Sequence, residues 1–324
     1  MGKPFSIHPL DPGFVLAKPI QSVPQEILLD LEARERLRIG RKHDGHCALA
    51  TSNARLYSRT VNELTAKFPD LAGELRELDL PNGTLLAGEA LVEIDGKESQ
   101  STFSSLARSL PERAIAMQQE LNLCVQLRLY NVAAHIGKPV LHLPYDDRYD
   151  LLQELLHRHT SRNIRLVEHL SVPLDAAQQM SIADGWEGLV LYDGSASSDY
   201  RLDGNHDRTP RPDGCWKWKD YLEDDFVATG WVKSDAASRS GMLRDILLAQ
   251  YHPVTGQLIE CGRMSSGFTL EQRRELADDE RYPFVVQLRF ERRTPSGKLI
   301  RAEVMRIRDD KTPEECLFPS NLLS

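Results

Sequence analysis

The sequence has few of the features that mark secreted, membrane or zinc-cluster proteins. Its five cysteines are scattered and form no CxxC pair, which argues against both a disulfide framework and a zinc site. No stretch approaches the roughly 18 consecutive apolar residues of a membrane span. The N-terminal segment lacks the continuous apolar core and cleavage site of a secretory signal. We therefore expect reduced thiols in a cytoplasmic protein that has no membrane partner.

An excess of positive charge is also absent, since the formal net charge is −8. This excludes a protein covered uniformly with DNA-binding basic residues, but two segments are locally basic. Arg34–Arg59 has seven basic residues against two acidic ones, and Arg281–Lys311 has nine against four. Each segment is either a solvated charged face or a set of phosphate contacts.

The pattern of apolar residues predicts two domains, an α+β domain over residues 1–221 and an all-β domain over 222–324. In the first, β-rich apolar runs at 84–94, 121–133, 187–192 and 215–219 are interspersed with helical patterns at 104–120, 147–158 and 173–184. Residues 195–214 are poor in apolar residues and predict a long surface loop. In the second, five strand-like runs and one helix, 269–279, suit a small barrel such as an OB-fold.

Lys42 stands two residues before an Asp44-Gly45 turn, between two segments that both resemble strands. Asp-Gly is a strong hairpin signal, so one interpretation is a hairpin with a solvated lysine near its tip. The other is a nucleophilic lysine held at the edge of a pocket. The motif alone is too short to separate them.

Other charged residues lie in or next to apolar strands. Glu89 and Glu187 each adjoin a glycine in such a run, where a carboxylate is costly unless it faces water or binds a metal, a hydroxyl or a cation. Lys217 and Lys219 alternate with tryptophans, which predicts both lysines on one strand face, ~7 Å apart. This face either meets solvent or holds an anion such as a phosphate.

Three further signals are weak singly. Arg59 follows the lysine motif, and Tyr130 ends an apolar strand, where it is either a core residue or a ring that stacks on a base. Near the C-terminus, Arg306, Arg308 and Lys311 cluster after a strand. This cluster is either a charged strand end or a set of contacts to a polyphosphate.

In chain order, these motifs resemble those of the covalent nucleotidyltransferases: ATP-dependent DNA ligases, with RNA ligases and capping enzymes as relatives. The matching segments are KHDG at 42–45, SR at 58–59, GE at 88–89, Tyr130, EGLVL at 187–191, KWK at 217–219 and RIRDDK at 306–311. "LAKPI" before the lysine and "GRMSSGF" after it resemble the DNA ligase branch. Asn131 departs from a common aspartate, and Tyr192 departs from a common lysine.

The resemblance implies a nucleotidyltransferase domain, ATP-grasp-like, followed by an OB-fold domain. It implies that Lys42 attacks the α-phosphate of ATP and carries AMP, which passes to a 5′-phosphate before a 3′-hydroxyl seals the nick. An amine must lose its proton before it attacks, and nearby positive charge favours the neutral amine. Arg41, Lys217, Lys219 and Mg²⁺ are the groups expected to supply that charge.

The same resemblance implies the roles of the other residues. Lys217 and Lys219 are expected to hold the α-phosphate, Tyr130 to stack on adenine, and Arg59 to bind AMP or the 5′-phosphate. Glu89 and Glu187 are expected to bind Mg²⁺ or its waters, and Mn²⁺ suits the same oxygen ligands. Alternatively, Glu89 is expected to accept a hydrogen bond from a ribose hydroxyl. Arg306, Arg308 and Lys311 are expected to orient pyrophosphate.

The expected partner is nicked double-stranded DNA, bound by a monomer without regard to sequence. Because only 41 residues precede Lys42, we expect no DNA-binding domain ahead of it, and loop 195–214 is a candidate accessory DNA contact. The alternatives are an RNA ligase, a GTP-dependent capping enzyme, and a non-catalytic OB-fold nucleic-acid binder.

Overall fold

The chain folds into two compact units, Met1–Lys219 and Asp220–Ser324, each with its own hydrophobic core. The computed structural model describes residues 19–20, 23–157, 159–197, 213–294 and 297–323. Most of the predicted loop 195–214 and of "LAKPI" lies outside the described residues. None of the helices in the described ranges has the length and apolar character needed to cross a membrane.

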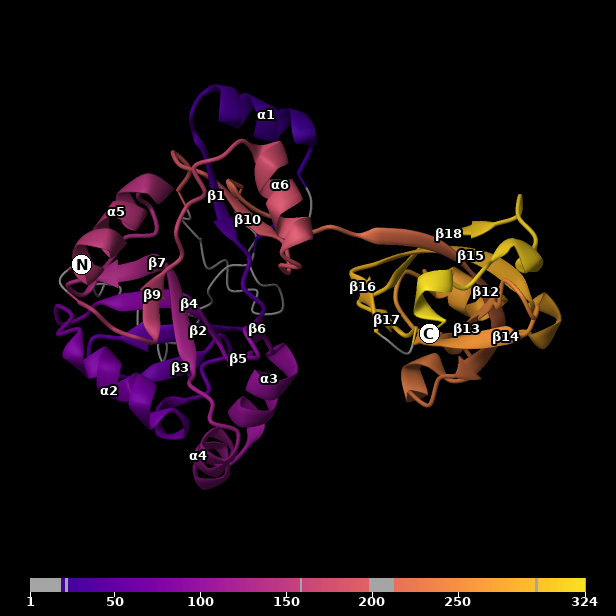
Figure 1. The fold of residues 1–324 in the computed structure, drawn as a ribbon, viewed down its shortest axis with the longest axis horizontal. Coiled ribbons are helices and arrows are strands. Elements are labelled where there is room, and N and C mark those ends of the chain that lie inside the picture. Colours follow the sequence, from indigo (N-terminus) through magenta and orange to yellow (C-terminus); the bar gives the residue numbers. More distant parts are fainter. Residues whose placement is uncertain (1–18, 21–22, 158, 198–212, 295–296, 324) are drawn as a thin grey trace. The chain divides into compact units, whose positions relative to one another are not determined.

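The larger sheet of the first unit has the strand order β3-β2-β4-β7-β8, with β9 parallel to β7. Figure 1 labels β2, β3, β4, β7 and β9 of this sheet. Its strands are β2 (His46–Thr51), β3 (Leu56–Ser58), β4 (Leu85–Leu91), β7 (Gln126–His135), β8 (Lys138–Pro139) and β9 (Ile164–Leu166). A separate two-stranded hairpin follows β4 and consists of β5 (Glu93–Ile94) and β6 (Lys97–Glu98).

Alternation of side chains along the strands gives this sheet two buried faces. Ala48 and Ala50 of β2 join one core cluster, whereas Cys47 and Leu49 join another on the opposite face. Helices contribute apolar residues such as Phe103 to the first cluster. The helices of this part are α2 (Pro69–Glu77), α3 (Gln100–Arg108), α4 (Pro111–Glu120) and α5 (Tyr145–Leu156), with a 3₁₀ turn at Thr65–Lys67.

The smaller sheet of the first unit consists of β1 (Leu37–Arg41), β10 (Leu189–Asp193) and β11 (Cys215–Trp218), in the order β1-β10-β11. One face packs on α1 (Gln25–Ala33) and α6 (Leu174–Ala183), which lie beside β1 and β10 in Figure 1. Leu189, Leu191 and Trp216 point to these helices. By the two-residue period, Val190 and Lys217 point to the other face, where the candidate site lies.

The second unit is built on an antiparallel sheet with the order β14-β13-β12-β15-β18. Phe226, Leu248 and Val286 are fully buried in its core. Its elements are β12 (Leu222–Lys233), β13 (Leu243–Tyr251), β14 (Leu258–Met264), α7 (Leu270–Glu275), β15 (Phe284–Phe290), β16 (Arg292–Arg293), β17 (Leu299–Ile300) and β18 (Glu303–Arg308), with 3₁₀ turns at Ala237–Arg239, Asp279–Arg281, Pro313–Glu315 and Ser320–Leu322.

Two details of the predicted elements are wrong. The helix predicted over 104–120 is two helices, because Pro111 lacks the N–H that a continuous helix would need and instead begins α4. The hairpin interpretation of the lysine motif also fails. The strand before Lys42, β1, pairs with β10, and the strand after it, β2, pairs with β3 and β4. Lys42 therefore lies where the chain crosses from one sheet to the other.

Candidate active site

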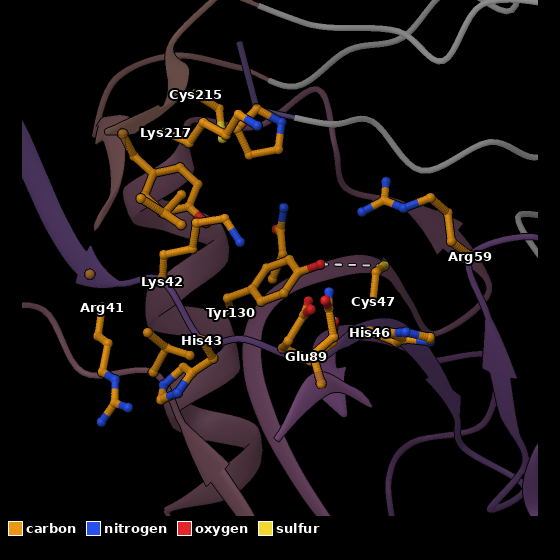
Figure 2. Close-up of a pocket in the computed structure, with 18 of the residues that line it drawn as sticks. Arg41, Lys42, His43, His46, Cys47, Arg59, Glu89, Tyr130, Cys215 and Lys217 are labelled. Carbon is orange, nitrogen blue, oxygen red and sulfur yellow. Dashed lines mark hydrogen bonds between the residues drawn. The ribbon is translucent and has the colours of Figure 1, made fainter. Parts of the chain in front are cut away.

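A cavity of about 470 Å³ lies between the facing sides of the two sheets of the first unit. The smaller sheet contributes Gly40, Val190 and Lys217, and the larger sheet contributes Cys47 and Glu89. Among the ten residues labelled in Figure 2, Lys42, Arg59 and Tyr130 reach into this space from different elements. The crossing between sheets thus brings together residues that lie far apart in the sequence.

Two glycines allow the Lys42 segment to sit against its neighbours. A Cβ on Gly45 would lie 2.3 Å from the carbonyl oxygen of Ala90. Gly188 has a φ of +141°, and a Cβ there would lie 2.2 Å from the carbonyl oxygen of Trp218. The carbonyl oxygen of Gly188 accepts a hydrogen bond from the Lys42 backbone N–H at 2.9 Å. Both glycines are required by close backbone approach, which fixes the backbone at Lys42.

The Lys42 ammonium pairs with the Glu187 carboxylate, which also binds the Lys219 ammonium at 2.7 Å. The Glu187 side chain is 8% exposed and that of Lys219 is 4% exposed. Burial alone would raise the pKa of Glu187, but the two lysines outweigh it and lower that pKa to about 2. One ionised carboxylate therefore holds two ammonium groups beside the cavity.

The structure corrects the expected placement of Glu187 and Lys219. Glu187 lies just before β10 rather than within a strand. Lys217 lies in β11 and lines the cavity, whereas Lys219 lies beyond the end of β11 and turns to Glu187. Lys219 lies one residue beyond the end of the strand, and the shared face of the two lysines stays a prediction.

Glu89, on β4, lines the cavity and lies close enough to Lys42 and Glu187 for their charges to act on it. Burial raises the pKa of Glu89 to about 7, with the Glu187 charge adding to the rise and the Lys42 charge opposing it. Two neighbouring carboxylates thus have opposite electrostatic environments: Glu187 is ionised, and Glu89 titrates near neutral pH.

We expect the Glu89→Gln variant to be more stable than the parent protein at pH 8, but not at pH 4. Because its pKa is raised, Glu89 binds its proton more tightly in the folded protein than in the unfolded chain. The free energy of unfolding of the parent protein therefore falls as pH rises from 4.5 through 7 and Glu89 ionises. A shift of this size corresponds to about 3 kcal/mol. Urea unfolding in a metal-free buffer measures the free energy of unfolding. An equal difference between Glu89→Gln and the parent protein at pH 4 and pH 8 would contradict a raised pKa for Glu89.

Another part of the cavity wall consists of aromatic side chains. Tyr192 stacks on Tyr145 with ring centroids 4.0 Å apart and an interplanar angle of 6°. Tyr145 also hydrogen-bonds His169 at 3.0 Å, and burial lowers the pKa of His169 to about 4, so the imidazole is neutral at pH 7. Tyr130 points into the cavity, and its hydroxyl donates to the Cys47 sulfur at 3.5 Å (Figure 2).

A buried arginine supports this aromatic wall. Arg148 is 1% exposed and donates from Nε to the Asn131 side-chain oxygen at 3.0 Å and from its guanidinium to the Leu141 carbonyl oxygen at 3.1 Å. Asn131, the residue that departs from the common aspartate, lines the cavity and is held by this contact. Sequence patterns did not single out Arg148, Tyr145 or His169, since each lies in a segment that reads as ordinary helix or loop.

The donor set suits a divalent cation held jointly with a substrate. Among the described residues, no group of three or more His, Cys, Asp or Glu side chains is placed to hold a metal ion. Magnesium commonly binds through one or two carboxylates together with substrate phosphates rather than in an all-protein cage. Glu89 and Glu187, near each other and beside three cationic side chains, match that arrangement.

The predicted pyrophosphate residues belong to the second unit. Arg308 donates to the Asp310 carboxylate at 2.7 Å, and Lys311 donates to Asp225 at 2.8 Å. Arg306 donates to the Gln287 side-chain oxygen at 2.8 Å. These contacts fix the three side chains on and after β18, and their expected role at the nucleotide stays a prediction.

Comparisons with known proteins agree with this geometry. Residues 15–208, more than half of the chain, match the family model for the ATP dependent DNA ligase domain. DNA ligase 2 of Methanosarcina acetivorans is 23% identical over 94% of this chain and 58% of its own length. The DNA ligase of Archaeoglobus fulgidus is 26% identical over 82% of this chain and 49% of its own length. The chain thus spans about half the length of the curated relatives it matches.

A solved Lig E DNA ligase superposes on 91% of this chain and 100% of its own chain, with a TM-score of 0.63 and 16% identity. The likeness confirms the predicted fold class, an α+β domain followed by an OB-like domain. The family model and the shared fold lead to one conclusion: this chain belongs to the ATP dependent DNA ligase domain family.

Proposed function

We propose that this protein is an ATP-dependent DNA ligase that seals nicks through AMP attached to Lys42. The observation that carries the proposal is the position of Lys42, whose backbone is fixed where the two sheets meet and whose side chain enters the cavity (Figure 2). A lysine whose backbone is fixed by close contacts, and whose side chain lines a nucleotide-sized cavity, suits a nucleophile that must meet one phosphorus atom.

The cavity is lined by both aromatic rings and cationic side chains, which supports a nucleotide as its occupant. The aromatic rings suit a base, with Tyr130 as the stacking ring. Lys42, Arg59 and Lys217 are cationic and suit phosphates. With ATP bound in this way, Glu89 lies near the ribose or the metal, Lys217 and Lys219 support the α-phosphate, and Arg59 binds AMP or the 5′-phosphate of the nick.

In the first step, the neutral Lys42 amine forms a bond to the α-phosphorus while the bond to the pyrophosphate oxygen breaks. The lysine gives up one proton to solvent before the attack and a second as the phosphoramidate forms, and pyrophosphate departs with both bonding electrons. An oxygen of a DNA 5′-phosphate then bonds to the AMP phosphorus while the P–N bond breaks and Lys42 takes up protons again. Finally the 3′-hydroxyl bonds to the 5′-phosphorus, loses its proton to solvent, and AMP leaves. Since little acid–base chemistry is available, positioning and charge stabilisation supply most of the rate.

A magnesium ion bound by Glu187 and Glu89 would neutralise phosphate charge, and Mn²⁺ suits the same oxygen ligands. Arg306, Arg308 and Lys311 would approach the pyrophosphate from the second unit. The DNA contacts are expected to be with the backbone and therefore to weaken as salt is raised.

Nick sealing with different nucleotides tests the proposal. We expect ATP and Mg²⁺ to support joining of a nicked DNA duplex, and GTP to fail. Joining of nicked RNA at the same or a higher rate would favour an RNA ligase, and formation of a GMP adduct would favour a capping enzyme. The matched control is the same nick without a 5′-phosphate, which cannot accept AMP.

A further inference from the structure

A single buried carboxylate contacts three of the residues that surround Lys42. The Glu98 Oε1 atom lies 2.6 Å from His43 Nδ1 and 2.8 Å from the Arg41 guanidinium. Its other oxygen, Oε2, accepts a hydrogen bond from the Asp44 backbone N–H at 2.7 Å. Glu98 therefore binds the residue before the nucleophile and both residues after it.

Glu98 lies in β6, in the hairpin that follows β4, and its side chain is only 6% exposed. Burial would raise the pKa of Glu98, but the contacts from His43 and the Asp44 N–H outweigh it, so that pKa is lowered. The carboxylate is thus ionised at neutral pH, and its hydrogen bonds are of the strong, charge-assisted kind. A solvated surface glutamate would show neither the burial nor the three contacts.

The network continues from Arg41 to the segment that carries Glu187. The Arg41 guanidinium lies over the Trp186 ring, 5.2 Å from its centroid, and Trp186 directly precedes Glu187. In Figure 2 the Arg41 side chain extends in the opposite direction from that of Lys42. Arg41 and Glu98 thus connect the two backbone segments, 41–44 and 186–188, whose side chains meet in the Lys42–Glu187 pair.

We propose that Glu98 is a positioning residue for self-adenylation, which sets the backbone of 41–44 so that the Lys42 amine faces the α-phosphorus. This inference rests on the proposed function. Glu98 is not among the residues that line the cavity, and it contacts Arg41, His43 and Asp44, which flank Lys42. Its effect should therefore fall on the step in which Lys42 is the nucleophile, and not on the closing step, in which the nucleophile is a DNA hydroxyl.

The Glu98→Gln variant tests this selectivity. The amide keeps the shape of the side chain but cannot form the ion pair with Arg41. Two rates are compared: formation of the protein–AMP adduct in a single turnover with saturating ATP, and sealing of a nick that already carries a 5′-adenylate. The matched control is Glu93→Gln, since Glu93 is the register partner of Glu98 in the same hairpin and its side chain is 35% exposed.

We expect adduct formation by Glu98→Gln to slow by about 10- to 100-fold, because a small misplacement of a reacting group has effects of that order. Sealing of the pre-adenylated nick and the KM for ATP should stay near the parent values, and Glu93→Gln should match the parent throughout. Glu98→Asp keeps the charge but withdraws it by one methylene. If Glu98→Gln is unstable, Glu98→Asp serves instead, and we expect it to slow adduct formation without slowing the sealing of the pre-adenylated nick.

Equal losses in both rates would mean a general structural role and would overturn the inference, as would an unchanged rate of adduct formation. Failure of the parent protein to form any adduct is a separate result, because it rejects the proposed function itself and the role of Glu98 together with it. Thermal unfolding of each variant confirms that the compared proteins are folded.

Discussion

Replacing Lys42 by arginine will abolish transfer of AMP to the protein while leaving the fold intact. The guanidinium keeps the positive charge that pairs with Glu187, but it does not lose its proton in proteins and cannot attack the α-phosphorus. We expect adduct formation to fall by at least about 10³-fold, the scale associated with loss of an essential nucleophile. Intact-mass spectrometry after incubation with ATP and Mg²⁺ measures the adduct directly.

The Lys42→Ala variant completes the comparison, because it removes both the nucleophile and the ion pair. Both variants should lose the adduct, but only alanine should alter the environment of Glu187. Lys138→Ala, at an exposed residue of strand β8 in the same unit, is the matched control and should form the adduct normally. An adduct on either Lys42 variant, in protein first freed of AMP carried over from expression, would show that another residue is the nucleophile.

Sealing of a pre-adenylated nick separates the roles of Lys42 further. That reaction uses no lysyl-AMP, so we expect both variants to retain it to within about tenfold, in keeping with the independence of the steps. Its loss to the same extent as adduct formation would assign Lys42 a role in DNA positioning as well.

Sequence patterns predicted many of the strands and helices that form the two cores, since two-residue alternation and Pro and Gly signals are local. They did not predict helices α1 and α2, which also supply buried leucines. Nor did they predict which strands pair. The Asp44-Gly45 turn has the composition of a hairpin, yet β1 and β2 belong to different sheets, because apolar residues such as Ile39 and Leu49 find their partners far along the chain. Strand pairing depends on such distant contacts, which local composition does not record.

The same limit applies to the site. Lys42, Glu89, Tyr130 and Lys217 line one cavity and were identified from motifs, although their chemical roles stay predictions. Glu98 was missed, because in "DGKES" it is one charged residue of an ordinary turn and its three contacts lie more than 50 positions earlier. A residue that acts through its neighbours has no motif in the local sequence. It can be identified only from the contacts that it makes in the folded structure.

Glu187→Gln should reduce adduct formation by about 10²- to 10³-fold, the range seen when an electrostatic partner of a reaction centre is removed. The carboxylate contacts the ammonium groups of Lys42 and Lys219, and a neutral amide cannot balance both. The variant should also lose stability, because the pKa of about 2 lies well below the ordinary 4.5. The ionised carboxylate stabilises the fold by about 3 kcal/mol above pH 4.5, an amount lost as pH falls towards 2.

Loss of stability and loss of activity must be separated, since Glu187→Gln removes the carboxylate that the buried Lys219 ammonium binds at 2.7 Å. The double variant Glu187→Gln, Lys219→Met removes this second charge and replaces it with an apolar chain of similar length. Paired buried charges can be replaced by apolar groups at little cost, whereas breaking one partner costs about 3–5 kcal/mol. The double variant should therefore recover stability at pH 7, measured by urea unfolding, without recovering adduct formation. Recovery of both would contradict the roles proposed for Glu187 and for Lys219, because the double variant lacks both charged side chains.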